Sequence, residues 1–169
     1  MLNRWWQNSK PGEVREIPFL APSVIAHLES LIEGGWRILE HGSGGSTLWF
    51  STRCREVIAI ENNEEWRNAL LERKAPNVRV VPFLPPDFYG FDLMLIDGDP
   101  LEDRAAYLKN AYDLVKPGGY VVLDNANRPH YENEREWLKK NCKSYKTFDC
   151  NEPGTKYLMT EFFKLKGEK

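Results

Sequence analysis

The stretch that decides the fold is RILEHGSGGSTLWF, residues 37–50. It begins with the apolar pattern of a buried strand, and this pattern ends on Glu40. Gly42, Gly44 and Gly45 follow within a few residues, and an apolar helical pattern comes next. Glycine lets a ligand approach a turn without meeting a Cβ atom. The stretch therefore predicts a strand, a tight turn that something approaches closely, and a helix.

Short apolar runs alternate with helical patterns along the rest of the chain. After an irregular segment over residues 1–20, a helix is expected over 22–35, with Pro22 in its first turn. Apolar strands separated by helices are typical of a parallel sheet covered on both faces, because each return crossing needs a helix. The sequence therefore predicts a doubly wound α/β fold. The expected strands are 36–41, 56–61, 78–83, 91–97 and 120–125, and the helices between them are 46–53, 63–74 and 101–115.

The end of the chain has a different pattern. After a helix at about 131–141, the runs 143–150 and 156–165 flank Asn-Glu-Pro-Gly, which is a turn signal. We therefore expect a terminal antiparallel hairpin that brings the sheet to seven strands. With no repeat or linker, residues 1–169 should form a single domain, as suits a chain of this length.

Composition narrows the setting. Net charge is −2, from 23 Lys and Arg against 25 Asp and Glu, which gives no broad attraction to nucleic acid. The three cysteines, Cys54, Cys142 and Cys150, lack the spacing of a zinc site and are expected to be reduced thiols. No apolar run is long enough to cross a membrane, and no signal-peptide core is present at the N-terminus. A cytoplasmic protein without membrane or nucleic-acid partners is expected.

Acidic and amide residues end three further predicted strands. Glu61 follows the glycine turn by about 20 residues, where an acidic side chain can accept hydrogen bonds from both ribose hydroxyls of a nucleoside. Asp97 ends the fourth strand, and Asp124 and Asn125 end the fifth. In open α/β sheets ligands bind at this edge, beyond the carboxyl ends of the strands. A dinucleotide is not expected, because Thr47 stands where the last glycine of G-x-G-x-x-G is required.

The acidic residue before Gly-x-Gly, with Ser46 after it, resembles motif I of the class I S-adenosylmethionine (SAM)-dependent methyltransferases. The run Lys116-Pro117-Gly118-Gly119 before the fifth strand is also common in that family. The resemblance implies a Rossmann-like fold and SAM as cofactor, with adenine near Phe83 and Leu84. It implies the following cofactor-binding residues: Glu40, Gly42, Ser43, Gly44, Gly45, Ser46, Thr47, Glu61, Asn62 and Asp97.

The resemblance also bears on the acceptor. The fourth strand is followed by Asp-Gly-Asp and not by the Asn/Asp-Pro-Pro-Tyr/Phe motif of amine-directed enzymes, so a hydroxyl oxygen on a small molecule or sugar is expected. Asp97, Asp124 and Asn125 resemble the metal site of catechol- and caffeoyl-CoA-type O-methyltransferases, and such oxygen ligands suit Mg²⁺. The alternative is a metal-free enzyme in which Asp97 orients the acceptor and His130 is the base.

Two other functions fit parts of the pattern. A non-catalytic module that binds the nucleoside would need the same cofactor loop. Aminopropyltransferases of the spermidine synthase type share the fold, and residues 97–100, Asp-Gly-Asp-Pro, faintly resemble their fourth motif. The acceptor site is expected from residues 1–20, 82–90 and 126–131. Trp5 and Trp6 in the first of these could equally pack on the sheet or form a homodimer contact.

Overall fold

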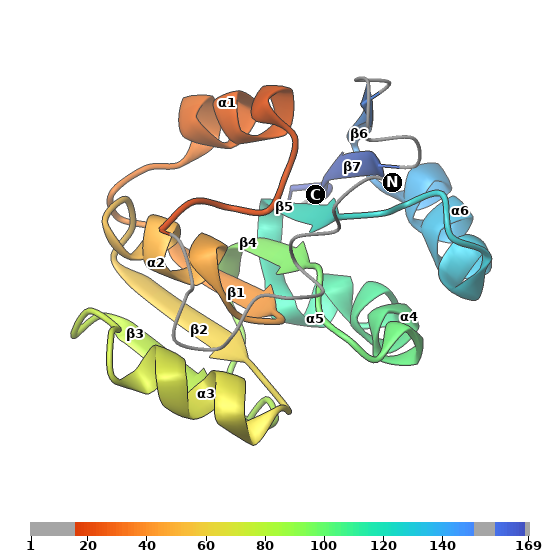
Figure 1. Ribbon diagram of the computed structural model, residues 1–169. Coiled ribbons are helices and arrows are strands. Elements are labelled where there is room, and N and C mark those ends of the chain that lie inside the picture. The colour runs from red at the N-terminus through yellow and green to blue at the C-terminus, as the bar shows by residue number, and fades with distance from the viewer. Residues whose placement is uncertain (1–15, 151–157, 168–169) are drawn as a thin grey trace.

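The structure, a computed structural model, describes residues 16–150 and 158–167 of the chain (Figure 1). Its centre is a seven-stranded sheet with the order β3-β2-β1-β4-β5-β7-β6. The first five strands run parallel, whereas β7 is antiparallel to both β5 and β6. The predicted doubly wound sheet with a C-terminal hairpin is therefore confirmed. The strands are β1 (Arg37–His41), β2 (Glu56–Ile60), β3 (Val78–Val81), β4 (Phe91–Ile96), β5 (Val115–Leu123), β6 (Ser144–Cys150) and β7 (Leu158–Lys164).

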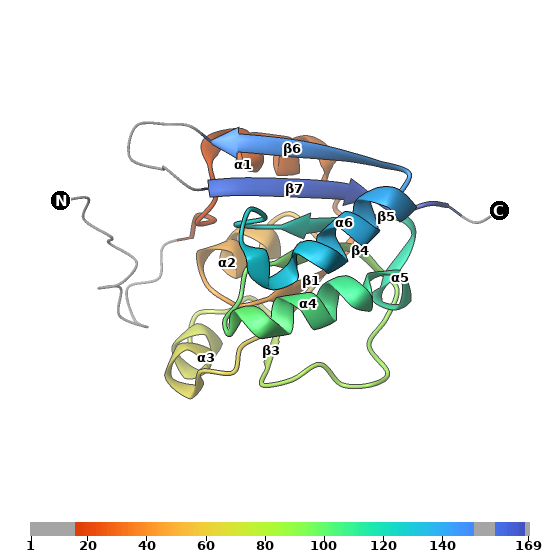
Figure 2. The same cartoon turned by 90° about the vertical axis from the view of Figure 1, so that its right-hand side faces the viewer.

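Helices cover both faces of the sheet. One face carries α1 (Pro22–Leu31), α2 (Gly45–Ser51) and α3 (Glu64–Leu71), whose buried side chains share one apolar cluster with the strands. The other face carries α4 (Leu101–Lys109), α5 (Ala111–Leu114), the 3₁₀ turn η3 (Pro129–Tyr131) and α6 (Glu132–Asn141), which build a second cluster. In Figure 2 the helices α4 and α6 lie in front of the sheet. None of the helices in the described residues is long and apolar enough to cross a membrane.

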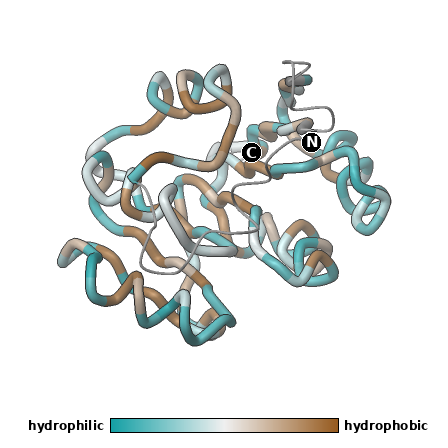
Figure 3. The backbone as a smooth tube through the Cα atoms, viewed as in Figure 1, coloured by the Kyte–Doolittle hydropathy of each residue, from teal (hydrophilic) through white to brown (hydrophobic). Residues whose placement is uncertain are grey.

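The strand residues explain why the sheet is buried on both sides. Successive residues of β1 alternate between the two clusters, so that Ile38 faces the first and Leu39 the second, and both are fully buried. A strand with apolar residues at every position is stable only between two helical layers. Figure 3 shows the same arrangement, with hydrophobic segments along the central strands and hydrophilic residues concentrated on the outer helices.

Two local predictions need correction. The run over residues 116–119, expected before the fifth strand, lies inside β5, where it forms a bulge: Phe91 pairs with Val115, but Leu93 pairs with Tyr120. The bulge is possible because Gly118 adopts a φ of 76°, in a region that favours glycine. The predicted single helix over 101–115 is broken between α4 and α5 at Asn110, a residue that favours helix ends.

Part of the predicted acceptor wall lies outside the described residues. This applies to Trp5 and Trp6, and the turn predicted for the final hairpin, residues 151–154, also lies outside them. Within the irregular segment 1–20, residues 16–20 contain no helix or strand, as predicted.

Candidate functional site

A cavity of about 350 Å³ lies at the carboxyl ends of β1, β2 and β4. A volume of this size is within the range of small-molecule sites. Of the described residues that line it, four are acidic and none is Lys or Arg. The full lining is Glu40, Gly42, Ser43, Ser46, Glu61, Asn62, Asn63, Trp66, Asp97, Gly98 and Asp99. The cavity thus brings together seven predicted cofactor residues, whereas Gly44, Gly45 and Thr47 lie in the same loop but not on its wall.

Glu40 is the buried acid of the site. Its carboxyl group, 1% exposed, accepts hydrogen bonds from the hydroxyls of Ser46 and Thr47 in the first turn of α2. Burial raises the pKa of Glu40 to about 7, although the two hydroxyls oppose the rise and the charge of Glu61 adds to it. The residue therefore changes its charge near neutral pH.

Glu61 is the second acid of this half of the site. It follows β2, and its carboxylate accepts hydrogen bonds from the Ser43 hydroxyl at 3.0 Å and from the Asn63 backbone N–H at 2.9 Å. The side chain of Asn63 caps α3 by accepting from the Trp66 backbone N–H. Because each carboxylate oxygen can accept a second hydrogen bond, Glu61 is positioned by the protein and can still accept from a ligand.

The glycines of the loop have different roles. A Cβ atom on Gly42 would lie 2.8 Å from Gly98 Cα, and Gly42 has a φ of 97°. Its missing side chain therefore makes room for the backbone after β4, which is a close approach of the kind that the sequence predicts for this turn. At Gly44, by contrast, a Cβ atom would meet nothing within 4 Å.

The ends of β4 and β5 are joined by Arg104 of α4, a residue that is 2% exposed. Its Nε donates to the Gly98 carbonyl at 2.8 Å, its Nη1 to the Asp124 carbonyl at 2.8 Å and its Nη2 to the Asp97 carbonyl at 2.6 Å. The same Nη2 lies 3.4 Å from Asp97 Oδ1. The guanidinium thus contacts the backbone just after the end of each of the two strands.

Two carboxyl groups meet beside this guanidinium. The carboxyl groups of Asp97 and Asp124 interact, and the pKa of Asp97 is raised well above its usual range by burial and then by the charge of Asp124. Arg104 opposes that rise, and Glu40 adds to it. Asp124 is held from β7 by the Thr160 hydroxyl, which donates at 2.7 Å. The Asp97 side chain is 30% exposed, so this carboxyl group faces the cavity while Asp124 lies behind it.

Known structures were compared with this arrangement. Searches with family models and against curated protein sequences find no match for the chain. Among solved structures, the tRNA (m1A58) methyltransferase TrmI from Aquifex aeolicus matches with a TM-score of 0.67 and 16% identity, over 89% of this chain and 71% of that chain. The O-methyltransferase TomG from Streptomyces achromogenes, solved with SAM, matches with a TM-score of 0.65 and 22% identity, over 90% and 84%. The chain has the Rossmann-like fold of class I SAM-dependent methyltransferases.

Enzymes named for RNA are also among these matches. The T. thermophilus 16S rRNA N2 G1207 methyltransferase RsmC, in complex with AdoMet and guanosine, has a TM-score of 0.65 and 17% identity, over 91% of this chain and 46% of that chain. The methyltransferase fold is therefore shared with enzymes whose names specify RNA and with others named as O-methyltransferases.

The oxygens predicted to bind a metal in this methyltransferase fold already have partners. Asn125 Oδ1 accepts from Arg128 Nη2 at 2.8 Å, and Asp124 Oδ1 accepts from Thr160. The buried Arg104 cation lies against the same two strand ends. In the part of the chain that the structure describes, no cluster of three or more His, Cys, Asp or Glu side chains could hold a metal ion. The predicted Mg²⁺ site is therefore not supported.

Other predicted residues lie away from the cavity. His130 is exposed in η3 and is not part of the lining, so its role as a base remains a prediction from the sequence. Phe83 is 71% exposed and Leu84 packs into the second apolar cluster, whereas Trp66 of α3 is the aromatic residue on the wall. The predicted adenine contact is thus not supported for the loop after β3.

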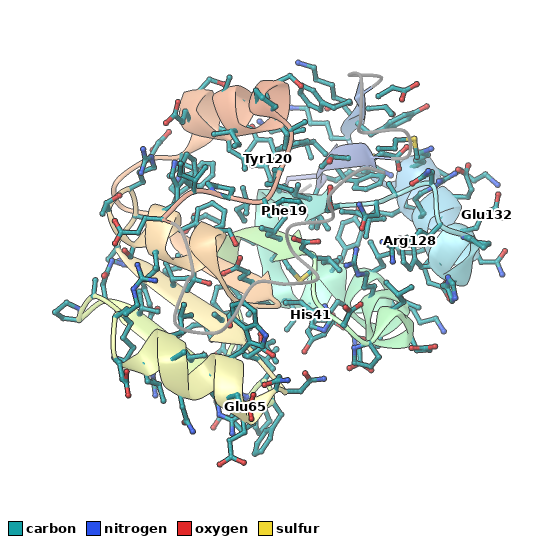
Figure 4. All side chains as sticks on the ribbon, in the orientation of Figure 1. Phe19, His41, Glu65, Tyr120, Arg128 and Glu132 are labelled. Carbon is teal, nitrogen blue, oxygen red and sulfur yellow. The ribbon has the colours of Figure 1, made fainter. Side chains whose placement is uncertain are left out.

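Sequence reasoning missed Arg104, Thr160 and His41. The His41 ring packs on Tyr107 at 4.4 Å, and burial, with the charge of Arg104, lowers the pKa of His41 to about 4. Figure 4 shows His41 near the end of β1 and Arg128 toward α6. The only signal for Arg104 was an arginine in an otherwise acidic first stretch of α4, which does not by itself indicate a buried residue.

Proposed function

We propose that this chain is a SAM-dependent methyltransferase that methylates a hydroxyl oxygen of a small-molecule or sugar-type acceptor. One observation carries the proposal. In a methyltransferase fold, the cavity at the ends of β1, β2 and β4 has four acidic residues and, among its described residues, no cation on its wall. Such a wall suits a ligand that carries ammonium and sulfonium groups and repels phosphates.

The two acids of the β1–β2 half would bind the cofactor. Glu61 would accept hydrogen bonds from the ribose hydroxyls, because Ser43 and Asn63 hold its carboxylate toward the cavity. Glu40 and the loop over residues 42–47 would hold the methionine portion. A bound ammonium group would favour the ionised form of Glu40, which protonates readily with a pKa of about 7.

Asp97 would act at the reacting end. When bound, SAM supplies an activated methyl group, which passes to the acceptor oxygen as the carbon–sulfur bond breaks and S-adenosylhomocysteine (SAH) is left. Asp97 in its carboxylate form would accept the hydroxyl proton and later release it to water. The raised pKa of Asp97 supports this role, because a stronger base accepts a proton more readily. Most of the acceleration of methyl transfer would come from positioning the acceptor oxygen against the methyl group. No step uses a divalent cation.

The sequence after β4 supports an oxygen acceptor, since Asp97, Gly98 and Asp99 replace the motif typical of amine-directed enzymes. A base in RNA is the second candidate acceptor, and the similarity to TrmI and RsmC is the observation that favours it. The net charge of −2 favours the first candidate, because RNA-binding surfaces need positive charge.

The first experiment tests the cofactor. Freshly purified protein is denatured and analysed for SAM or SAH by mass spectrometry, and SAH binding is measured by calorimetry. The second uses methyl-labelled SAM with two sets of acceptors, hydroxylated small molecules and sugars in one and tRNA and rRNA in the other. Label in the first set is expected. Label only in RNA would overturn the acceptor assignment, and no binding of SAM or SAH would overturn the cofactor assignment.

A further inference from the structure

We propose that Arg104 is the positioning residue of the transfer site: its guanidinium fixes Asp97 at the cavity wall and balances, from within the chain, the negative charge that Asp97 and Asp124 bring together. This inference rests on the proposed methyl transfer. It goes beyond it by naming what places the reacting carboxylate, and by predicting that the site needs no divalent cation.

Arg104 holds the ends of β4 and β5 together through three hydrogen bonds. Three different nitrogens donate to three carbonyl oxygens, of Asp97, Gly98 and Asp124, at 2.6–2.8 Å. Residues 97 and 98 follow β4 directly, and residue 124 follows β5. A planar guanidinium can reach several acceptors at fixed angles, whereas a lysine ammonium acts as a point charge. Arg104 therefore sets where the two strand ends lie relative to each other.

Arg104 also contacts the side chain of Asp97, the carboxyl group proposed to take part in the transfer. The Arg104 nitrogen that binds the Asp97 carbonyl also lies 3.4 Å from Asp97 Oδ1, so backbone and carboxyl group are held by one atom. On its other side the Asp97 side chain is open to the cavity. Moving Arg104 should thus move the carboxylate that faces the sulfonium.

The buried charge of Arg104 is itself stable only because this site surrounds it with acceptors. A cation that is 2% exposed is tolerated only where carboxylates and carbonyls surround it. Asp97 and Asp124 supply the carboxylates. A divalent cation placed between the same two carboxyl groups would lie next to the guanidinium and be repelled by it. The positive charge of Arg104 therefore balances the two carboxyl groups and opposes the binding of a metal ion between them.

The ratio of SAM affinity to SAH affinity reports whether the Asp97 carboxylate lies beside the sulfur of the ligand. The two ligands differ by the methyl group and the positive charge on sulfur, so a carboxylate beside the sulfur favours SAM. Calorimetry on the full chain would compare wild type, Arg104→Lys, Asp97→Asn and the double variant. Lys109→Gln is the matched control, because it removes one positive charge from α4 at an exposed ion pair with Glu134.

Asp97→Asn is expected to lower the ratio about tenfold, as loss of a charged partner implies. Arg104→Lys should lower it about threefold, and should lower it no further in the Asp97→Asn background, because coupled residues are not additive. Lys109→Gln should leave it unchanged. An unchanged ratio in Arg104→Lys, with both affinities reduced together, would indicate a structural role only and overturn the inference. The inference would also be overturned if Arg104→Lys lowered the SAM-to-SAH affinity ratio by the same factor in wild type and in Asp97→Asn.

A separate measurement needs no variant to fold well. Mn²⁺ titration of the wild-type protein with bound SAH, followed by electron paramagnetic resonance, is expected to show no stoichiometric site. One tightly bound Mn²⁺ that Asp97→Asn abolishes would overturn the inference even if Arg104→Lys fails to fold. A wild-type chain that binds neither SAM nor SAH would instead remove the proposed function, and this inference with it.

Discussion

The two halves of the site are built in different ways. At the ends of β1 and β2, Glu40 is held by two hydroxyls from residues that follow it, and Glu61 by the Asn63 N–H of its own loop and the Ser43 hydroxyl of the loop after β1. At the ends of β4 and β5, Asp97 and Asp124 are held by Arg104 on α4 and by Thr160 on β7, which is 36 residues beyond Asp124. The first half carries its own supports, whereas the second depends on elements brought in by the fold. Substitutions should therefore act locally in the first half and through tertiary contacts in the second.

The largest effect is expected where the two halves touch. Gly42→Ala adds a Cβ atom 2.8 Å from Gly98 Cα at a φ of 97°. Backbone strain and overpacking together should lower the free energy of unfolding by about 2–6 kcal/mol. Gly44→Ala is the control, since its Cβ atom meets nothing within 4 Å, and should cost less than about 1 kcal/mol. Denaturant unfolding measures both. Equal losses of unfolding free energy in Gly42→Ala and Gly44→Ala would show that the contact with Gly98 does not exclude a side chain at position 42.

A pH effect should follow from Glu40. The folded carboxyl group has a pKa of about 7, against 4.5 for an ordinary glutamate such as that of the unfolded chain, so between these pH values the folded state holds more protons than the unfolded state. Stability should therefore fall as pH rises through this window, by about 3 kcal/mol for this residue. Glu40→Gln should remove that part of the slope. Unfolding curves measured from pH 4.5 to 7 test this, and parallel pH profiles for the two proteins would contradict it.

Ligand affinity should depend on Glu61. Glu61→Ala removes a carboxylate that two local donors hold on the cavity wall, and should weaken SAH binding by about tenfold or more. Glu65→Ala is the control, because Glu65 is exposed on the neighbouring helix α3 (Figure 4) and does not line the cavity. Calorimetry that gives the same affinity for both variants would remove Glu61 from the site.

The smallest effect is expected at Thr160. Thr160→Val keeps the shape of the side chain but removes the donor to Asp124 Oδ1, which should lower the free energy of unfolding by about 1 kcal/mol. SAH affinity should stay within error of wild type, because Thr160 supports the transfer half only. A large loss of SAH affinity would show that the halves are not independent.

The same contrast explains what the sequence could predict. The doubly wound class of the fold and the first half of the site follow from short-range patterns: apolar strands, glycine turns and acidic residues at strand ends. Glu40 and Glu61 both line the cavity, and their cofactor contacts stay predictions. The second half was only partly predicted. Asp97 lies on the wall, but Asn125 turns to Arg128, and Arg104 holds the strand ends. Nothing in local spacing indicates which distant side chain enters such a cluster.

The contact between Gly42 and Gly98 also limits how this sequence can vary. A Cβ atom at Gly98 would lie 2.6 Å from the Gly42 backbone nitrogen, so each position excludes a side chain because of the other's main chain. Replacing one residue gives the other no new room, since the obstacle is backbone. In a library that randomises both positions and selects for folded protein, we expect glycine to be retained at both together, while Gly44 accepts other small residues.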